Sequence, residues 1–379
     1  MNFNNPKKNR SAPVAENRVV VITGAGAGIG RATVREFART GARIGLIERD
    51  PERLEQTADE VRRLGGEALI CRADVADADQ VEAAAANVAA EFGRIDVWIN
   101  NAMATIYSPF QKISSEDYKR ATEVTHLGTV YGTMAALRRM TLQNSGIILQ
   151  VGSALAYRAI PLQSPYCGAK FAIRGFTDAL RSELLHDRSN IRITMIHLPA
   201  HNTPQFDWGK NQMPMRPQPV PPIFKPEMAA KAIFWASRHP RREVYLGWPT
   251  IKTIWANKFI PGLIDRYLVR AGYAGQQSPQ PSDPDAADNL WQPVPGNFAA
   301  HGRFDKLAKP GTVQLWASLY RGPLALGLLT AGLLGYRLWR RKQQRDRIGY
   351  AMLPGQTEAN GPAPKRFNNS EASDYEYRA

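Results

Sequence analysis

The chain is poor in cysteine, because Cys71 and Cys167 are the only two among its 379 residues. So few cysteines exclude a disulfide framework and are typical of a reducing compartment, so we expect a cytoplasmic protein. Residues 1–16 are polar and basic and contain no apolar stretch, which predicts a disordered tail rather than a secretory signal. The sequence also contains no internal repeat.

Acidic residues are outnumbered, since 34 Asp and Glu stand against 49 Lys and Arg, a formal net charge of +15. Such an excess is compatible with nucleic-acid binding, but no stripe of basic and aromatic residues accompanies it. We therefore expect no nucleic-acid partner. Much of the excess lies in residues 340–347, RRKQQRDR, which favours an anionic membrane surface. No metal site is predicted.

Residues 18–30, RVVVITGAGAGIG, combine a short β-branched run with a glycine-rich turn, and a helical pattern follows as far as Gly41. Gly24, Gly28 and Gly30 allow a tight turn and a close approach of the main chain to a pyrophosphate. The start of the helix offers free N–H groups and the positive end of a dipole. The turn therefore favours a dinucleotide site, although a glycine-rich turn without a ligand has the same pattern.

Residues 147–170 predict a buried strand, a turn that carries Ser153, and a helix with Tyr166 and Lys170 one turn apart on one face. A phenol titrates near ~10, and a neighbouring ammonium lowers that pKa. The Ser153 hydroxyl can hydrogen-bond the same substrate oxygen as the phenol. The three side chains predict a proton-relay site for a carbonyl or an alcohol. Taken alone, the Tyr–Lys spacing is also common on solvated helix faces.

In combination these motifs resemble the short-chain dehydrogenase/reductase family over residues 15–250. The matching stretches are TGAGAGIG at 23–30, Asp74-Val75, NNA at 100–102, Ser153, YCGAK at 166–170, and Pro199 with Thr203. The resemblance implies an α/β fold, a Rossmann-like doubly wound parallel sheet flanked by helices, with a C-terminal helical and disordered extension. It also implies an enzyme that transfers a hydride between NAD(P) and a secondary alcohol or ketone.

The family also implies a role for each matching residue. Tyr166 is the acid and base, Ser153 binds the substrate oxygen, and Lys170 lowers the tyrosine pKa and holds the ribose. The residues implied to contact the dinucleotide are Thr23, Gly24, Gly28, Ile29, Gly30, Glu48, Arg49, Asp74, Val75, Asn101, Ala102, Tyr166, Lys170, Pro199 and Thr203.

The choice between NAD and NADP depends on the end of the second strand. Glu48 can accept hydrogen bonds from the ribose hydroxyls and repels a 2′-phosphate, which favours NAD. Arg49 follows it and would attract that phosphate, which favours NADP. Ala27 stands where many NADP-dependent members carry a basic residue. The balance favours NAD.

Two residues depart from the family pattern. Met103 stands where a glycine is usual, and it either narrows the cleft near the nicotinamide or only repacks its loop. Thr125 takes the place of the asparagine that completes the family's catalytic tetrad, and its main-chain carbonyl can keep the water that this residue holds. These departures leave a second hypothesis, a catalytically impaired dinucleotide-binding scaffold that acts through its C-terminal extension.

The pattern along the chain predicts six segments. A disordered tail at 1–16 precedes the catalytic domain at 17–250. A helix at 251–275 then caps the substrate cleft or lies on a membrane interface. Residues 276–312 read as an extended Pro-rich linker, 313–340 as an apolar helix, and 341–379 as a disordered polar tail.

Two further segments bear on substrate and partners. Residues 204–225 are rich in Pro, Met, Trp and Phe and occupy the position of the family's substrate lid, so we expect a small lipophilic alcohol or ketone. The helix at 165–186 is apolar on two adjoining faces, which suits packing on the sheet and on a partner subunit. The family commonly dimerises there, so a homodimer or homotetramer is expected.

The C-terminal apolar segment allows two interpretations. Its uncharged run, residues 322–336, is shorter than the ~20 residues of a membrane-spanning helix. A single helix over 313–339 would be ~40 Å long and could cross with Arg321 at an interface and the 340–345 cations on the cytoplasmic side. The alternative is an amphipathic or core-docked helix. Either form of membrane association would involve residues 313–340.

Overall fold

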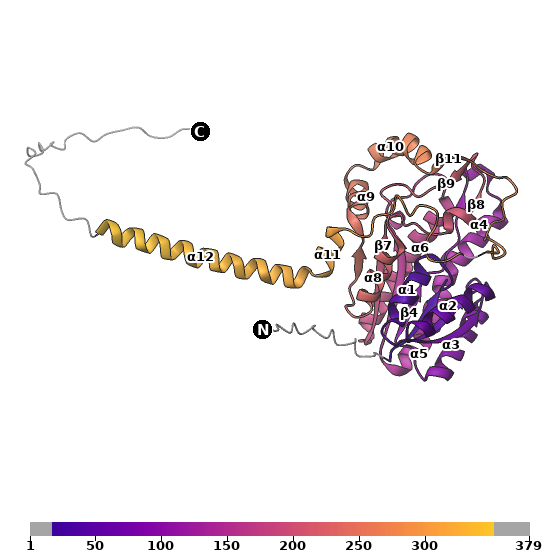
Figure 1. Cartoon of the computed structure of the whole chain (residues 1–379), viewed down its shortest axis with the longest axis horizontal. Helices are drawn as coiled ribbons and strands as arrows, with labels where there is room; N and C mark the ends of the chain where they lie inside the picture. Colours follow the sequence, from indigo (N-terminus) through magenta and orange to yellow (C-terminus); the bar gives the residue numbers. More distant parts are fainter. Residues whose placement is uncertain (1–16, 297, 352–379) are drawn as a thin grey trace, which may run out of the picture. The chain divides into compact units, whose positions relative to one another are not determined.

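The computed structural model describes residues 17–296 and 298–351 (Figure 1). The predicted N-terminal tail and most of the predicted C-terminal tail lie outside the described residues. The chain divides into two units, of which the first ends at Tyr320 and the second begins at Arg321.

The first unit is built on a seven-stranded parallel sheet with the strand order β10-β7-β6-β4-β1-β2-β3. Its strands are β1 (Val19–Thr23), β2 (Arg43–Glu48), β3 (Glu67–Arg72), β4 (Val97–Asn100), β6 (Gly146–Ser153), β7 (Ile191–Leu198) and β10 (Glu243–Tyr245). β1 is central, because Val20 pairs with Ile44 of β2 and with Val97 of β4. The strand order reverses at β1, and the carboxyl ends of strands at such a point form a ligand-binding crevice.

Helices cover both faces of the sheet, which is why its central strands are apolar throughout. All five residues of β1, VVVIT, are buried. One face packs against α1 (Gly28–Ala38), α2 (Pro51–Arg63) and α8 (Pro226–Ala236). The other packs against α3 (Ala78–Phe92), α4 (Ser115–Thr122), α5 (Gly128–Gln143) and α6 (Ser164–His186). The predicted Rossmann-like doubly wound fold is confirmed.

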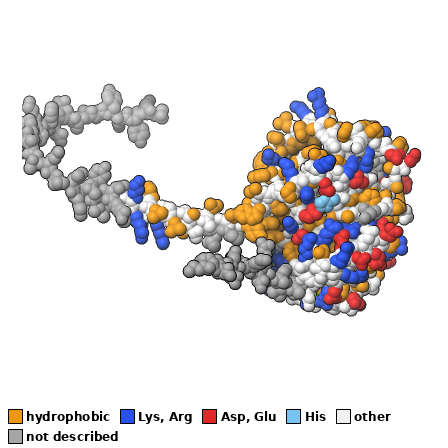
Figure 2. Space-filling model, viewed as in Figure 1, with side chains coloured by type: hydrophobic (Ala, Val, Ile, Leu, Met, Phe, Trp, Pro, Cys, Tyr) orange, Lys and Arg blue, Asp and Glu red, His pale blue; other side chains and the backbone are white. Residues whose placement is uncertain are grey.

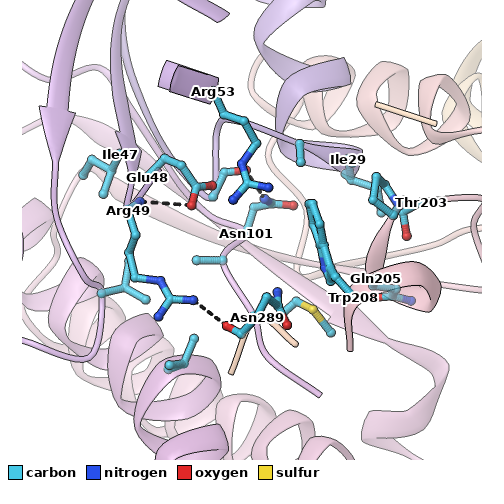
Figure 3. A pocket seen from close by; sticks show the side chains of 18 of the residues that line it. Ile29, Ile47, Glu48, Arg49, Arg53, Asn101, Thr203, Gln205, Trp208 and Asn289 are labelled. Atoms are coloured by element: carbon cyan, nitrogen blue, oxygen red, sulfur yellow. Dashed lines mark hydrogen bonds between the residues drawn. The ribbon is translucent and has the colours of Figure 1, made fainter. Parts of the chain in front are cut away.

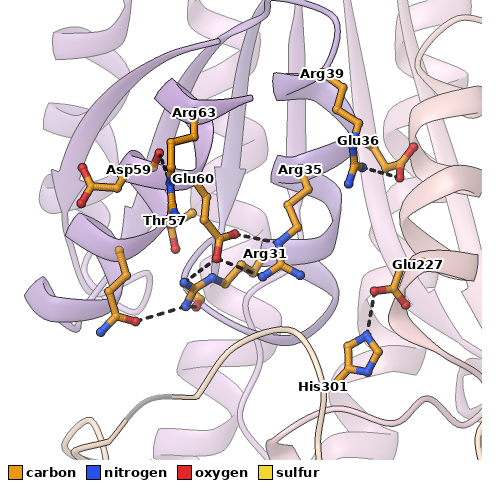
Figure 4. Close-up of polar contacts among 12 residues, drawn as sticks. Arg31, Arg35, Glu36, Arg39, Thr57, Asp59, Glu60, Arg63, Glu227 and His301 are labelled. Atoms are coloured by element: carbon orange, nitrogen blue, oxygen red, sulfur yellow. Dashed lines mark hydrogen bonds and ion pairs between the residues drawn. The ribbon is translucent and has the colours of Figure 1, made fainter. Parts of the chain in front are cut away.

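Ion pairs join α1 to α2 behind the glycine-rich turn (Figure 4). Glu60 of α2 binds Arg31 at 2.8 Å and Arg35 at 2.7 Å, both of α1. Burial opposes ionisation, but the hydrogen bonds from Arg35 and Arg31 hold the pKa of Glu60 at about 2. These contacts orient the helix whose N-terminus follows the turn.

The predicted helix near residues 114–140 is present, but it is not uniform. A π-helical turn, Glu123–Leu127, separates α4 from α5. Such a turn inserts one residue into the helical repeat and often marks a functional position. The side-chain spacing used in the sequence analysis assumes a regular helix and cannot reveal this turn.

The region after β10 differs from the predicted linker. Two helices, α9 (Gly247–Phe259) and α10 (Pro261–Ala274), replace the single helix expected at 251–275. β11 (Gln277–Pro281) then pairs with β9 (Met215–Pro217) of the lid. Leu290 and Ala300 are fully buried, so the segment belongs to the first unit instead of extending away from it. Its Pro and Asp content predicts local extension, whereas these tertiary contacts depend on residues far away in the sequence.

The single helix predicted for residues 313–340 is interrupted at Tyr320. α11 (Val313–Leu319) docks on the first unit, because Leu315 is buried and Gln314 donates to the Tyr245 carbonyl at 3.3 Å. α12 (Arg321–Ala351) belongs to the second unit. Within the described residues, none of the helices combines the length and the apolar character required to cross a membrane. The spanning helix predicted as one alternative is therefore wrong for this part of the chain.

Candidate active site

Three side chains expected to carry the chemistry meet in one cavity. Ser153 ends β6, and Tyr166 and Lys170 lie one turn apart near the start of α6. The Ser153 and Tyr166 side chains hydrogen-bond each other. The Lys170 ammonium lies 5.5 Å from the centre of the Tyr166 ring and donates to the Val151 carbonyl at 2.7 Å. The end of β6 thus holds both the serine and the lysine.

Burial dominates the ionisation of these groups. It raises the pKa of the Tyr166 phenol, and the hydrogen bond with Ser153 opposes this only in part. Desolvation lowers the pKa of Lys170 to about 8. The expectation that Lys170 lowers the tyrosine pKa differs from this balance, because the loss of water around the phenol outweighs its neighbours. The phenol is therefore held in the protonated form that an acid requires.

A buried histidine on the neighbouring strand contacts the main chain of Ser153. His197 of β7 is fully buried, and its Nδ1 lies 3.2 Å from the Ser153 carbonyl oxygen. Its Nε2 lies 3.8 Å from Glu243 of β10. The Glu243 carboxylate also accepts a hydrogen bond from the Tyr157 hydroxyl at 2.6 Å. This network fixes the strand end on which Ser153 lies.

Thr125 lies in the π-helical turn and lines neither cavity described below. Its hydroxyl donates to the Ala104 carbonyl and accepts from the Ala104 N–H, both at 2.9 Å. Its own carbonyl accepts the Thr129 hydroxyl at 2.8 Å. Thr125 therefore pins the loop that follows β4. The neighbouring His126 packs against Phe176 at 5.9 Å between ring centres, as a packing histidine would.

The Ser153, Tyr166 and Lys170 side chains line a cavity of about 500 Å³. Its walls come from the lid, including Phe206 and Val220, and from α9 and α10, including Ala256 and Leu268. The helices after β10 therefore cap this cavity. Pro199 lines it too, although the family pattern associates that residue with the dinucleotide. Most of the lining side chains are apolar.

The glycine-rich turn is packed too closely for side chains. A Cβ at Gly30 would lie 1.9 Å from the Gly24 carbonyl oxygen, and one at Gly26 would lie 3.3 Å from a Glu48 carboxylate oxygen. Gly24 and Gly28 have positive φ angles of 64° and 55°, which glycine adopts without strain. Thr23 closes the turn by accepting the N–H groups of Asn101 at 3.0 Å and Ala102 at 3.1 Å. This cradle fits the pyrophosphate of a dinucleotide.

A second cavity, of about 140 Å³, lies against this turn (Figure 3). The expected residues that line it are Gly24, Gly28, Ile29, Glu48, Arg49, Asp74, Val75, Asn101, Ala102 and Thr203. Thr23 and Gly30 do not line this cavity, and they contribute only by shaping the glycine-rich turn. Met103 lines both cavities, as do Ile29, Asn101, Thr203 and Gln205, so a nicotinamide ring would lie where the two meet.

Arg53, Trp208 and Asn289 are among the residues of this cavity that the sequence did not indicate. Arg53 packs its guanidinium 4.8 Å from the Trp208 ring centre and pairs with Asp50 at 2.8 Å. Asn289 lies beside Trp208, whose carbonyl accepts the Asn289 N–H at 2.9 Å. Arg53 follows the strand-end acid by five positions, which is a usable signal. Trp208 and Asn289 reach the cavity only through the tertiary fold.

Comparison with known proteins decides the family. The sequence profile of the short chain dehydrogenase family matches residues 18–212. A Bacillus subtilis protein named "Uncharacterized oxidoreductase YxnA" is 30% identical over 86% of this chain and 91% of its own length. The chain belongs to the short-chain dehydrogenase family. As a member with the dinucleotide turn in place, it is an NAD(P)-dependent oxidoreductase.

Two further relatives of this short-chain dehydrogenase are a steroid dehydrogenase and an alcohol dehydrogenase. Mouse 17-beta-hydroxysteroid dehydrogenase 13 is 34% identical over 47% of this chain and 58% of its own length. A solved alcohol dehydrogenase from the archaeon Thermococcus sibiricus, complexed with 5-hydroxy-NADP, has a TM-score of 0.52 and 28% identity. It covers 60% of this chain and 94% of its own.

Proposed function

We propose that this short-chain dehydrogenase transfers a hydride between NAD(P) and a lipophilic secondary alcohol or ketone. The observation that carries the proposal is the meeting of Ser153, Tyr166 and Lys170 at the base of a largely apolar cavity that adjoins the dinucleotide cavity. The cofactor, when bound, supplies or accepts the hydride. Steroid and alcohol dehydrogenases among its relatives support a hydroxyl or carbonyl substrate.

In the direction of reduction, the Tyr166 phenol donates its proton to the substrate oxygen as negative charge develops there. When the substrate is bound, the Ser153 hydroxyl gives up its hydrogen bond with the phenol, donates to the same substrate oxygen and orients it. The Lys170 ammonium holds the ribose and supplies positive charge beside the phenolate that remains. Burial, which raises the phenol pKa, keeps Tyr166 protonated until the substrate oxygen demands the proton.

Turnover with both cofactors and a panel of apolar ketones and alcohols tests the proposal. Activity that rises with the apolar bulk of the substrate is expected, because the cavity of about 500 Å³ can bury such a substrate. Dinucleotide binding without turnover of any substrate would instead favour the catalytically impaired scaffold. That alternative depends on two departures from the family pattern, Met103 and Thr125. Thr125 exchanges hydrogen bonds with Ala104 and lines neither cavity, whereas Met103 lines both.

We propose that the enzyme prefers NAD. Glu48 lines the dinucleotide cavity at the end of β2, and its carboxylate accepts the Arg49 N–H at 3.0 Å. A fixed carboxylate at this position accepts ribose hydroxyls and repels a 2′-phosphate. The NADP analogue in the Thermococcus relative makes NADP the competing choice.

Replacing Glu48 by alanine is expected to raise the ratio of kcat/KM for NADP over that for NAD by about tenfold, because about 1.4 kcal/mol of repulsion is removed. Steady-state kinetics with both cofactors measures this ratio. Glu52→Ala, which removes an exposed carboxylate from the first turn of α2, is the matched control. An unchanged ratio in Glu48→Ala would show that this carboxylate does not face the ribose.

A homodimer through α6 is also proposed. Phe171 and Leu185 on this helix are 42% and 68% exposed, while Ile173 and Thr177 face the core. Apolar residues on a second face of a helix suit a partner subunit. Sedimentation equilibrium of the purified chain measures the state, and a monomer would contradict the proposal.

We propose that residues 313–340 bring the enzyme to an anionic membrane surface. Along α12, Leu328, Leu329 and Leu333 are exposed, and Arg340, Arg341 and Lys342 follow. In the first unit, hydrophobic side chains gather on the side where Figure 1 places α9 and α11 (Figure 2). Exposed Trp255, Phe259 and Trp316 lie on these helices. Aromatic rings and neighbouring cations are typical of interfacial binding.

The full chain is expected to sediment with anionic lipid vesicles and to bind neutral vesicles much less, because cations contribute about 1 kcal/mol each near an anionic surface. A chain ending at Tyr320 keeps the docked α11 and should lose most of this binding. Catalytic activity in both chains is the control for folding. If the full chain stays in the supernatant with anionic vesicles, the membrane proposal fails.

A further inference from the structure

A short segment after β11 contributes Asn289 to the lining of the dinucleotide cavity and contacts two arginines that line it. Residues 289–294, here called the strap, lie more than 230 residues after β2 and yet contact its end. Three main-chain carbonyls of the strap accept hydrogen bonds from two arginines that line the cavity. Arg49 donates to Asn289 at 2.6 Å and to Trp291 at 2.9 Å, and Arg53 donates to Val294 at 3.3 Å.

These contacts occupy the Arg49 guanidinium. Both of its terminal nitrogens donate to the strap, and Nη1 also lies 3.8 Å from the Asp74 carboxylate. Figure 3 shows the Arg49 side chain extended toward Asn289, while the Glu48 carboxylate lies nearer to Arg53 and Asn101. A 2′-phosphate that draws the Arg49 guanidinium toward the ribose would compete with these two charge-assisted hydrogen bonds.

The strap is anchored between the first and the last of these carbonyls, at Leu290 and Trp291. Leu290 is fully buried in the core beneath α4 and α5, and its carbonyl accepts from the Arg120 side chain at 3.1 Å. The Trp291 indole N–H donates to Asp117 at 2.9 Å, and its ring lies 5.6 Å from the Arg120 guanidinium carbon. Trp291 itself is half-exposed. Its ring therefore holds in place the part of the strap whose carbonyl accepts from Arg49, and the ring itself lies outside the core.

We propose that the strap is a determinant of cofactor preference. It holds the Arg49 guanidinium on main-chain carbonyls, so this cation does not bind the 2′-phosphate of NADP. Glu48 alone then determines whether the site prefers the ribose of NAD or that of NADP. The proposal rests on the proposed function, since it assumes that the cavity of about 140 Å³ takes the adenosine part of a dinucleotide. It assigns to a segment beyond the family's core a part in cofactor selection.

The test is a cycle of variants in the full chain. Titration calorimetry measures the Kd of NAD and of NADP for wild type, Trp291→Ala, Arg49→Ala and the double variant. Trp291→Ala removes the indole that fastens the strap, so the Kd for NADP is expected to fall about tenfold relative to that for NAD. The double variant is expected to lose this gain in NADP affinity, because the gain requires the Arg49 guanidinium that Trp291→Ala releases from the strap.

Two further variants keep the result interpretable. Trp291→Phe keeps a ring over Arg120 but loses the N–H, so an intermediate change is expected and a folding defect is less of a risk. Trp248→Ala removes a Trp of similar exposure on α9 that lines neither cavity, and it should leave the Kd ratio unchanged.

The outcomes separate this inference from the proposed function. If the wild type binds NAD but the Kd ratio in Trp291→Ala and Trp291→Phe equals that of the wild type, the strap does not select the cofactor. The same conclusion follows if the gain in NADP affinity persists in the double variant, which lacks Arg49. If the wild type binds neither dinucleotide, the proposed function fails together with the inference.

Discussion

Replacing Tyr166 by phenylalanine is expected to lower kcat by about 10²–10⁴-fold, the usual contribution of a general acid or base. The phenol, which lines the substrate cavity together with Ser153, is the proposed proton donor, while the ring that packs beside Lys170 is retained. The Kd for the dinucleotide should stay within about tenfold, since a lost neutral hydrogen bond is worth roughly 0.5–1.5 kcal/mol. Single-turnover kinetics and calorimetry measure the two quantities.

Tyr118→Phe is the matched control for this variant. Tyr118 lies on α4 and lines neither cavity, so its loss of a hydroxyl should leave kcat unchanged. Wild-type turnover in Tyr166→Phe would falsify the assignment of the proton donor. A joint loss of turnover and dinucleotide binding would place Tyr166 in cofactor binding instead.

The second large effect is expected at the glycine-rich turn. In Gly30→Ala, the new Cβ would lie 1.9 Å from the Gly24 carbonyl oxygen and 2.6 Å from the Asn101 amide nitrogen. The main chain of the turn cannot yield to such an overlap without opening, so the cradle for the pyrophosphate is lost. We expect dinucleotide affinity to fall by more than about tenfold and unfolding free energy to fall by about 1–3 kcal/mol.

Gly311→Ala separates this steric effect from the general cost of replacing a glycine. Gly311 is exposed, and a Cβ there meets no atom within 4 Å. Calorimetry with NAD and chemical denaturation should find this variant close to wild type. Unaltered NAD affinity in Gly30→Ala would mean that the turn does not hold the dinucleotide.

The parts of this protein that the sequence predicts well are those set by local pattern. The seven strands of the main sheet, the glycine-rich turn and the Tyr166–Lys170 pair each follow from contiguous residues. In β1, for example, an apolar run is followed by glycines with positive φ angles. Hydrophobic periodicity and turn chemistry act over a few residues, so a single sequence is enough to read them.

Other features depend on contacts that local pattern does not contain. The π-helical turn around Thr125 arises where the helix meets the Ala104 loop, through hydrogen bonds across 21 positions. The Tyr166 pKa depends on how much water the surrounding fold excludes from the phenol, which outweighs the charge one turn away. The spacing of Tyr166 and Lys170 along a helix predicts that they are neighbours, but it does not predict how deeply the phenol is buried.

The C-terminal region makes the same distinction most clearly. Its Pro-rich composition predicts extended chain, and residues 289–294 do lack helix and strand. Local composition cannot predict that Leu290 enters the core or that the neighbouring carbonyls bind Arg49 across 240 positions. The sequence by itself determined the sheet, the glycine-rich turn and the spacing that brings Ser153, Tyr166 and Lys170 together. Only the tertiary structure decided what encloses them, because burial and long-range hydrogen bonds depend on residues that meet only after folding.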